Sequence, residues 1–322
     1  MSPLRTRTRV EGAWQGRGGP TGEAFRLGVT KPDALNTGAR AASTATYGAP
    51  GSPYTLEITT PGVYAPVTVW GKILVLANDV TLLQPRVYMT GTPSTAQHGI
   101  LFDDPNTHGC VVDRPTVTVP DPAHRLNENF SSGIRGRGFD VIRPDISYTV
   151  DGIHAVGKTG ATETRVVRVH GAFLHDFTER DSVSQGRTHN DGIQCFGSVE
   201  LEVIGSTIHG GTTSCIILNY ATSAGYGPVK IEDNWLHGDP DRGATINIST
   251  SGEPIPYLSV LRNRIDRDGH DSGQISVQTP HRVPAFFGAT SGTTNGTLAD
   301  WVYGLNSNTY MDDGSVARIQ AG

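Results

Sequence analysis

The chain has 322 residues, and its 26 Lys and Arg against 31 Asp and Glu give a net charge of −5. This balance excludes a strongly basic nucleic-acid-binding protein. Glycine supplies 40 residues, about 12% of the chain and nearly twice the ordinary share, whereas charged residues (18%) and aromatic residues (7%) are few. This composition disfavours coiled coils and helix bundles, and it favours many short strands joined by tight turns.

No apolar run approaches the length of a membrane span, and the longest are Ile73–Ala77 and Cys215–Leu218. The polar, Arg-rich stretch Met1–Arg9 is not followed by the apolar segment of a secretory signal, so we expect no signal of the standard type. The three cysteines are odd in number and lack CxxC spacing, so we expect buried apolar side chains rather than disulfides or a zinc site: Cys110, Cys195 and Cys215.

Four regions follow one another along the chain. Residues 1–28 carry five Arg against two Glu among several Gly, which predicts an N-terminal arm. Residues 29–62 are predicted to cap the N-terminal end of a repetitive region, 63–280, in which short β-branched runs recur. Residues 281–322, with several aromatic side chains, are predicted to form the C-terminal cap.

The repetitive region contains two columns of strands in a fixed order. The first places a Gly-Ile-like element at 133–134, 151–153, 191–193, 215–217, 245–246 and 274–275. The second consists of an alternating strand, a short polar corner and then an apolar residue. That apolar residue is, coil by coil, Leu174, Ile208, Leu236 and Ile265. These steps of 24 to 34 residues place the four apolar residues side by side, and they likewise place Ile193, Ile217, Ile246 and Ile275 side by side.

Short strands at this period, without helical periodicity between them, exclude the helical solenoids. Leucine-rich repeats have a similar period but require Leu at fixed positions, where this chain has Ile and Val. We therefore predict an all-β fold, a single-chain parallel β-helix with an N-terminal arm and a C-terminal cap, in which each coil pairs with the next about 4.8 Å away. Enlarged coils at 157–164 and 176–188 predict a binding surface, because insertions in solenoids gather on one face.

Four separated segments resemble a known superfamily: Thr30–Gly38, His189–Gln194, Asp233–Leu236 and Tyr310–Val316. Together they resemble right-handed parallel β-helix proteins of the pectate-lyase-like superfamily, in the branch found in actinobacteria and in the minor tail proteins of their phages. The resemblance covers about residues 29–318. It implies a right-handed coil, but the superfamily includes lyases, hydrolases and non-catalytic virion proteins.

Secreted members of this branch carry a signal peptide at the position where this chain has an Arg-rich arm. The arm therefore favours a virion protein over a secreted enzyme. We expect a bacteriophage minor tail or tail-tip protein, without enzymatic activity, that binds host cell-wall glycan and joins other tail proteins through residues 1–28. A homotrimer is implied by similar virion β-helices, and no nucleic-acid partner is expected. The alternative is an extracellular enzyme, a pectate-lyase-like polysaccharide lyase or a glycoside hydrolase.

Two aspartates are the main candidates for catalysis, if the protein is an enzyme. Asp151 and Asp191 each begin an Asp-Gly-Ile triplet, so we expect them at one position of consecutive coils, with Cys215 next in register. Carboxylates so close repel each other, which raises one pKa and can create the general acid that glycosidases need. The alternative role is structural, with each carboxylate accepting backbone N–H bonds at a corner.

His189 is the third catalytic candidate, because His189-Asn190-Asp191 resembles the Asn-Thr-Asp triplet of polygalacturonase-like hydrolases. The further motifs of those enzymes are absent at the expected places, which argues against that activity. Lyases of the superfamily use an Arg or Lys base with acidic calcium ligands, and four residues near the aspartates are candidates for that role or for ligand binding: Lys158, Arg165, Asp181 and Arg187. No other metal or cofactor is expected.

His175, His209 and His237 recur at one place in three coils, with Asp266 next. A histidine column can bind a metal ion or stack on sugars. Each histidine follows a core-facing apolar residue, however, so alternation predicts a column on the outer surface.

Overall fold

The computed structural model describes most of the chain between residues 25 and 321. The described ranges are 25–102, 107–156, 164–179, 181–182, 186–187, 189–197, 199–210, 212–219, 226–238, 244–248, 255, 257–267, 275–277, 307–312, 314–315, 317 and 319–321. Residues 1–24 lie outside them, so the predicted arm is described only from Phe25 onward.

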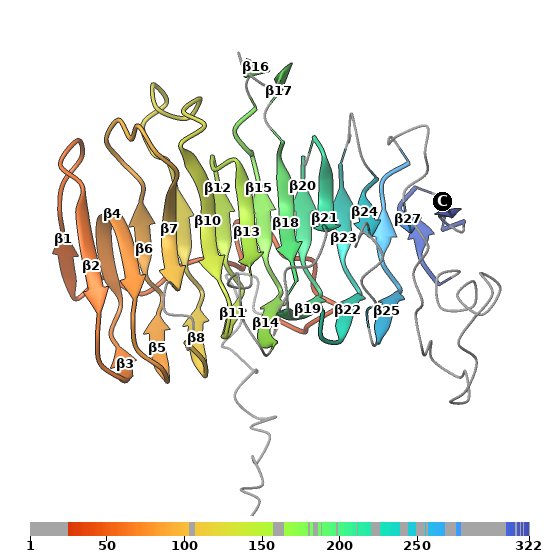
Figure 1. Ribbon diagram of the computed structural model, residues 1–322, viewed down its shortest axis with the longest axis horizontal. Coiled ribbons are helices and arrows are strands. Elements are labelled where there is room, and N and C mark those ends of the chain that lie inside the picture. The colour runs from red at the N-terminus through yellow and green to blue at the C-terminus, as the bar shows by residue number, and fades with distance from the viewer. Residues whose placement is uncertain are drawn as a thin grey trace, which may run out of the picture.

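The strands form three parallel ladders that wind around one core, and the described residues contain no helix (Figure 1). The first ladder contains β1 (Ala45–Tyr47), β4 (Val67–Val75), β6 (Arg86–Tyr88), β9 (Thr116–Thr118), β12 (Asp145–Ser147), β15 (Phe173–His175), β20 (Thr207–His209), β23 (Trp235–His237), β26 (Arg264–Ile265) and β28 (Thr309–Tyr310). The second contains β2 (Tyr54–Ile58), the end of β4, β7 (Gln97–Phe102), β10 (Phe130–Gly136), β13 (Asp151–Val156), β18 (Asp191–Phe196), β21 (Ser214–Leu218), β24 (Ile246–Ile248), β27 (Ile275–Val277) and β29 (Ile319–Ala321).

The third ladder contains β3 (Gly62–Tyr64), β5 (Val80–Leu83), β8 (Cys110–Asp113), β11 (Phe139–Ile142), β14 (Arg165–His170), β19 (Val199–Ile204), β22 (Val229–Glu232) and β25 (Leu258–Leu261). The long strand β4 joins the first two ladders into one sheet of 19 strands, and the third is a sheet of 8. The chain visits the ladders in the same order in each coil, which is the predicted parallel β-helix. One short antiparallel hairpin, β16 (Asp181–Ser182) with β17 (Gly186–Arg187), interrupts the pattern.

The core consists of apolar columns that run along the stack. Leu174, Ile208, Leu236 and Ile265 are paired in neighbouring coils and are fully buried, which confirms the predicted register of this column. The three cysteines are free and buried, also as predicted. Each coil alone is too thin to bury its apolar side, so the stack is stabilised by contacts between neighbours.

The predicted register of the Gly-Ile column was wrong by one residue in a single coil, the coil of β21. Ile193 pairs with Ile216, not with Ile217, and Ile216 in turn pairs with Ile246. All five residues of β21 are buried, so the alternation of apolar and polar residues could not show which of them face the core. The same shift places Ser214, rather than Cys215, in register with Asp191.

A repeated corner connects the third ladder to the first. One residue of each corner has a positive φ between 47° and 62°: Gln84, Arg114, Arg143, Gly171, Gly205, Asp233 and Arg262. In the last coils a buried asparagine follows, and Asn234 Nδ2 donates to Asn263 Oδ1 (2.8 Å), whose own Nδ2 donates to Asn308 Oδ1 (2.8 Å). This amide column satisfies polar groups that the corners would otherwise leave unpaired inside the protein.

Residues 25–44, which we call the strap, cross the outside of these corners (Figure 1). Lys31 Nζ lies 2.8 Å from His237 Nε2 in the coil of β23, Arg143 Nε donates to the Asn36 carbonyl (2.9 Å), and Arg86 donates to the Ala41 carbonyl (2.7 Å) in the coil of β6. The predicted N-terminal cap, 29–62, thus contains most of the strap together with β1 and β2, which pair with β4. Of the predicted C-terminal cap, β28 and β29 extend the first and second ladders.

Candidate functional site

Polar side chains gather on the outer face of the second ladder, at its middle coils. Arg135 of β10 pairs in register with His154 of β13, and His154 pairs with Gln194 of β18. Each of these residues directly follows the inward isoleucine of a Gly-Ile element, so alternation along the strand turns it outward. Arg135 contacts His98, and its charge lowers the pKa of Asp151, which pairs in register with Ser132, the hydrogen-bond partner of His98. We call Asp151, Asp191, His98, Arg135 and His154 the carboxyl–histidine cluster.

Asp151 and Asp191 occupy neighbouring coils at the start of β13 and β18, as their shared triplet predicted. The Asp151 carboxylate accepts a hydrogen bond from the Asp191 backbone amide (3.1 Å). Glycine follows each aspartate because a side chain there would collide with the core: a Cβ on Gly192 would overlap Ile208, and one on Gly152 would lie 3.1 Å from Leu174. The tight packing of the glycines thus fixes the positions of both carboxyls.

The environment of this pair favours the protonated acids. Both side chains are buried, Asp191 to 1% exposure, and burial is the largest cause of the raised pKa of each. The charge of Asp151 raises the pKa of Asp191 further, well above its ordinary value. Neither Asp191 carboxyl oxygen has a hydrogen-bond partner of good geometry within the described part of the chain, and the nearby Ser214 backbone amide only partly offsets the rise of the pKa. The pair therefore retains at least one proton near neutral pH.

The two histidines of the cluster are neutral. His98 Nδ1 lies 2.7 Å from Ser132 Oγ, and His98 Nε2 lies 3.2 Å from the Arg135 guanidinium. A guanidinium only donates, so Nε2 accepts and the proton sits on Nδ1. Burial, followed by the charge of Arg135, lowers the pKa of His98 and of His154 to about 3.

His154, like Asp191, has buried side-chain polar atoms without hydrogen-bond partners among the described residues. Its ring lies 5.2 Å from the Phe196 ring, and both ring nitrogens are buried without a hydrogen-bond partner among the described residues. Arg135 and Gln194, in the coils on either side, are half-buried and form the accessible edge of the cluster. The site thus combines a carboxyl pair holding a proton, an uncharged imidazole and a nearby cation.

The other candidate residues lie elsewhere. His189 is exposed, two positions before Asp191, and Lys158 lies outside the described residues. The backbones of Asp181 and Arg187 pair in the β16–β17 hairpin. Arg165 begins β14 on the third ladder, so it belongs to a different face from the two aspartates.

Sequence reasoning missed His98, Arg135 and His154. For the last two the signal was present, because both stand directly after a Gly-Ile element, as Gln194 does. For His98 the signal was present as well, because His98-Gly99-Ile100 repeats the triplet in which Asp151 precedes Gly-Ile. His98 pairs with Ser132, which in turn pairs with Asp151.

The histidine column lies on the outer face of the first ladder, as alternation predicted. The His209 and His237 rings stack at 4.0 Å, and burial lowers the pKa of His209 to about 4. His175 is held between Asp145 (3.0 Å) and Asp176 (2.8 Å), and these hydrogen bonds outweigh burial and raise its pKa. In the part of the chain that the structure describes, no three His, Cys, Asp or Glu side chains converge as ligands of a metal ion would.

The arrangement defines a class of protein, a parallel β-helix with a polar, proton-holding cluster on one outer face. Comparison of the chain with protein-family models, curated proteins and solved structures finds no match. Among the described residues, no helix is long and apolar enough to cross a membrane.

Proposed function

We propose that this protein binds a polysaccharide of a bacterial cell surface along the outer face of the second ladder, as a minor tail protein of a bacteriophage. The observation that carries the proposal is the carboxyl–histidine cluster. Buried polar atoms without partners destabilise a fold and are uncommon away from ligand sites and reactive sites. Asp191 and His154 together present four such atoms in adjacent coils.

A carbohydrate is the ligand that suits these atoms, because each sugar hydroxyl both donates and accepts a hydrogen bond. The carboxyl pair with its retained proton and the neutral His154 can do the same, and the half-buried Arg135 and Gln194 extend the polar surface along the stack. Repeating coils about 4.8 Å apart offer a repeating polymer equivalent positions along one direction. Phe196 provides an aromatic ring beside His154 on which a sugar can rest.

The tail assignment rests on the resemblance of the sequence to virion β-helices. In this proposal the residues before the strap join the protein to other tail proteins, and a homotrimer is the expected assembly. Phe25 stacks on Arg143 (4.4 Å), so a truncation that removes only residues 1–24 keeps the strap in place. That truncation is expected to prevent incorporation into virions while the solenoid stays folded.

The binding test uses the full chain and cell-wall polysaccharide extracted from an actinobacterial host, with polygalacturonate and dextran as comparison polymers. Calorimetry is expected to show binding of the host polysaccharide and a loss of at least tenfold in affinity for His154→Gln. The matched control is Glu200→Gln, a half-buried residue on the outer face of the third ladder, which is expected to bind as the unchanged protein does. Equal affinity of all three proteins, or no binding of any host polysaccharide, would refute the proposal.

Polysaccharide cleavage is the second candidate function, and the proton held by Asp151 and Asp191 favours it. A carboxyl group that is still protonated near neutral pH can serve as the general acid of a glycoside hydrolase. Incubation with the same polymers, followed by assays for reducing ends and for unsaturated uronate, separates the two functions. Turnover that disappears in Asp191→Asn supports an enzyme, whereas binding without turnover supports the tail protein.

A further inference from the structure

The strap runs out along the stack and then returns to the coil that it left. Arg143 lies over the Phe25 ring (4.4 Å), and the same Arg143 side chain donates to the Asn36 carbonyl (2.9 Å). Between these two contacts Lys31 reaches His237 in the coil of β23. Asn36 Nδ2 donates to the Lys31 carbonyl (3.0 Å), which holds the returning half together as a loop. Residues 26–35, which we call the strap tip, thus start and end near Arg143 and reach the coil of β23 through Lys31.

The hydrogen bond at the strap tip requires a neutral His237. Lys31 Nζ lies 2.8 Å from His237 Nε2, and an ammonium group only donates, so Nε2 is the acceptor. The proton of the neutral ring is therefore on Nδ1, which donates to Asp266 Oδ2 (2.7 Å). A second proton, on Nε2, would leave two donors facing each other and place two positive charges side by side.

The side chains around His237 set the pH at which it takes up this proton. Its ring stacks on that of His209 (4.0 Å), with His175 one coil further along the column. Burial is the largest cause that lowers the pKa of His237, and Lys31 lowers it further, whereas Asp266 opposes the shift. Burial, followed by the charges of His237, Lys31 and His175, lowers the pKa of His209 to about 4. Both rings are therefore neutral at pH 7, and they take up protons below the ordinary histidine pKa of 6.5.

We propose that the strap tip responds to pH and detaches from the coil of β23 when His237 takes up a proton. Lys31 then faces an imidazolium that no longer accepts its hydrogen bond, so the contact changes from attractive to repulsive. At lower pH the stacked His209 ring adds a further positive charge at the same place. Asp266 keeps its hydrogen bond in both states, because Nδ1 of His237 donates in both. The change is therefore confined to the side of the ring that faces the strap.

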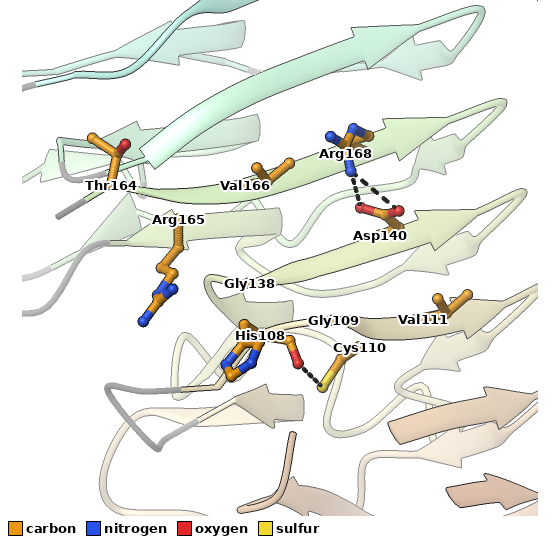
Figure 2. A pocket seen from close by; sticks show the side chains of 10 residues that line it. All are labelled: His108, Gly109, Cys110, Val111, Gly138, Asp140, Thr164, Arg165, Val166 and Arg168. Atoms are coloured by element: carbon orange, nitrogen blue, oxygen red, sulfur yellow. Dashed lines mark hydrogen bonds and ion pairs between the residues drawn. The ribbon is translucent and has the colours of Figure 1, made fainter. Parts of the chain in front are cut away.

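The charge pairs on the outer face of the third ladder are of a different kind. Arg168 Nη1 lies 3.1 and 3.4 Å from the two Asp140 oxygens, and Figure 2 shows these side chains pointing toward each other. Lys230 Nζ lies 3.2 Å from Glu202, whose pKa is lowered to about 2, first by a hydrogen bond with His170. Each pair joins a cation to a carboxylate, so it persists at a pH at which His237 is protonated. Mild acid is thus expected to detach the strap tip while the third ladder stays intact.

The test follows the strap tip with a nitroxide label on the full chain. The three native cysteines are buried, so a cysteine introduced by Val29→Cys, at a position that is 64% exposed, takes up the label selectively. Electron paramagnetic resonance between pH 8 and pH 4 is expected to show a mobile component that appears below pH 6.5. A label introduced by Thr46→Cys, at an exposed position of β1, is the control and should keep one mobility throughout. A Val29→Cys label whose mobility does not change, or changes only together with the control, would overturn the proposal.

Variants tie the change to one imidazole. His237→Gln offers an acceptor to Lys31 and a donor to Asp266 but does not titrate. At the pH at which the mobile component is half-maximal in the unchanged protein, this variant should reduce it at least fivefold. His175→Gln is the matched control, because His175 belongs to the same column but is held by Asp145 and Asp176, and it should leave the transition in place. An undiminished transition in folded His237→Gln would refute the assignment.

A second measurement does not require a change at His237. If protonation releases Lys31, removing Lys31 must make protonation easier, since the two equilibria are linked. NMR titration of the imidazole signals should therefore show a higher pKa for His237 in Lys31→Ala than in the unchanged protein, and the Val29→Cys label should be mobile in Lys31→Ala at every pH. A pKa of His237 that is the same in both proteins would contradict the proposal. None of these measurements involves a glycan, so the outcome is independent of the proposed function.

Discussion

Replacing Asp191 with asparagine should stabilise the protein, and more so as the pH rises. In the folded protein, burial and the neighbouring Asp151 keep the Asp191 carboxyl protonated well above its ordinary range. In the unfolded chain the same group ionises at a pKa of about 3.9. Because the folded state binds this proton more tightly, its contribution to stability is complete below pH ~4 and is lost as the pH rises toward the folded pKa.

The size of the effect follows from the pH interval. Holding one proton that the unfolded chain releases costs about 1.4 kcal/mol for each pH unit between the unfolded pKa of about 3.9 and the folded pKa. Asparagine has nearly the shape of the protonated acid and carries no proton to hold. Asp191→Asn should therefore equal the unchanged protein near pH 4 and exceed it in free energy of unfolding by an amount that grows by about 1.4 kcal/mol per pH unit until the folded pKa is reached.

Urea unfolding of both proteins at half-unit steps from pH 4 to pH 8 measures this difference. Titrating groups that do not interact with Asp191 cancel when one curve is subtracted from the other, whereas the titration of Asp151 is part of the measured difference. Glu57→Gln, an exposed carboxylate on β2 of the same ladder, is the control and should give a flat difference. A difference for Asp191→Asn that is flat, or that falls with rising pH, would show that the carboxyl is ionised in the folded protein. The account of the carboxyl–histidine cluster would then be wrong.

Two further predictions concern the solenoid. Asn263→Ala removes the acceptor of both the Asn234 backbone amide and the Asn234 side chain. It should therefore lower the free energy of unfolding, measured in urea, by about 2–4 kcal/mol. An unchanged unfolding midpoint would show that the amide column contributes nothing to stability. Glu202, whose pKa is lowered to about 2 chiefly by a hydrogen bond with His170, contributes stability that is present above pH ~4 and lost as the pH falls through 2. Glu202→Gln should therefore lower the free energy of unfolding by about 2 kcal/mol at pH 7 and by almost nothing at pH 2. A loss independent of pH would contradict the explanation that the ionised Glu202 carboxylate is stabilised by His170.

The sequence predicted the fold because its strands alternate. In Val167–Val169 of β14, Leu201–Val203 of β19 and Val229–Ile231 of β22 the outer residue is polar and its two neighbours are apolar and buried. The positions of these core residues could therefore be read directly from the sequence. In β21 every residue is buried, and there the register was misplaced by one position. Alternation therefore fixes the register only where one face of a strand meets water.

The candidate site was predictable in part. The repeated triplet placed Asp151 and Asp191 in neighbouring coils, but it gave no indication that both would be buried and that the Asp191 carboxyl would find no well-formed hydrogen bond among the described residues. Those properties depend on what the rest of the coil places over the strand, which periodicity does not encode. The strap was not predicted either, because its contacts join residues that share no repeat, such as Lys31 and His237.

The strap changes how the coils are coupled. In a simple stack each coil touches only its neighbours, so the terminal coils can fray one at a time. Lys31 and His237 are 206 residues apart in sequence, yet the strap holds them together while its other end contacts the coil of β6. An early coil therefore cannot peel away without also breaking contacts in the middle of the molecule, and the strapped portion should unfold as one cooperative unit.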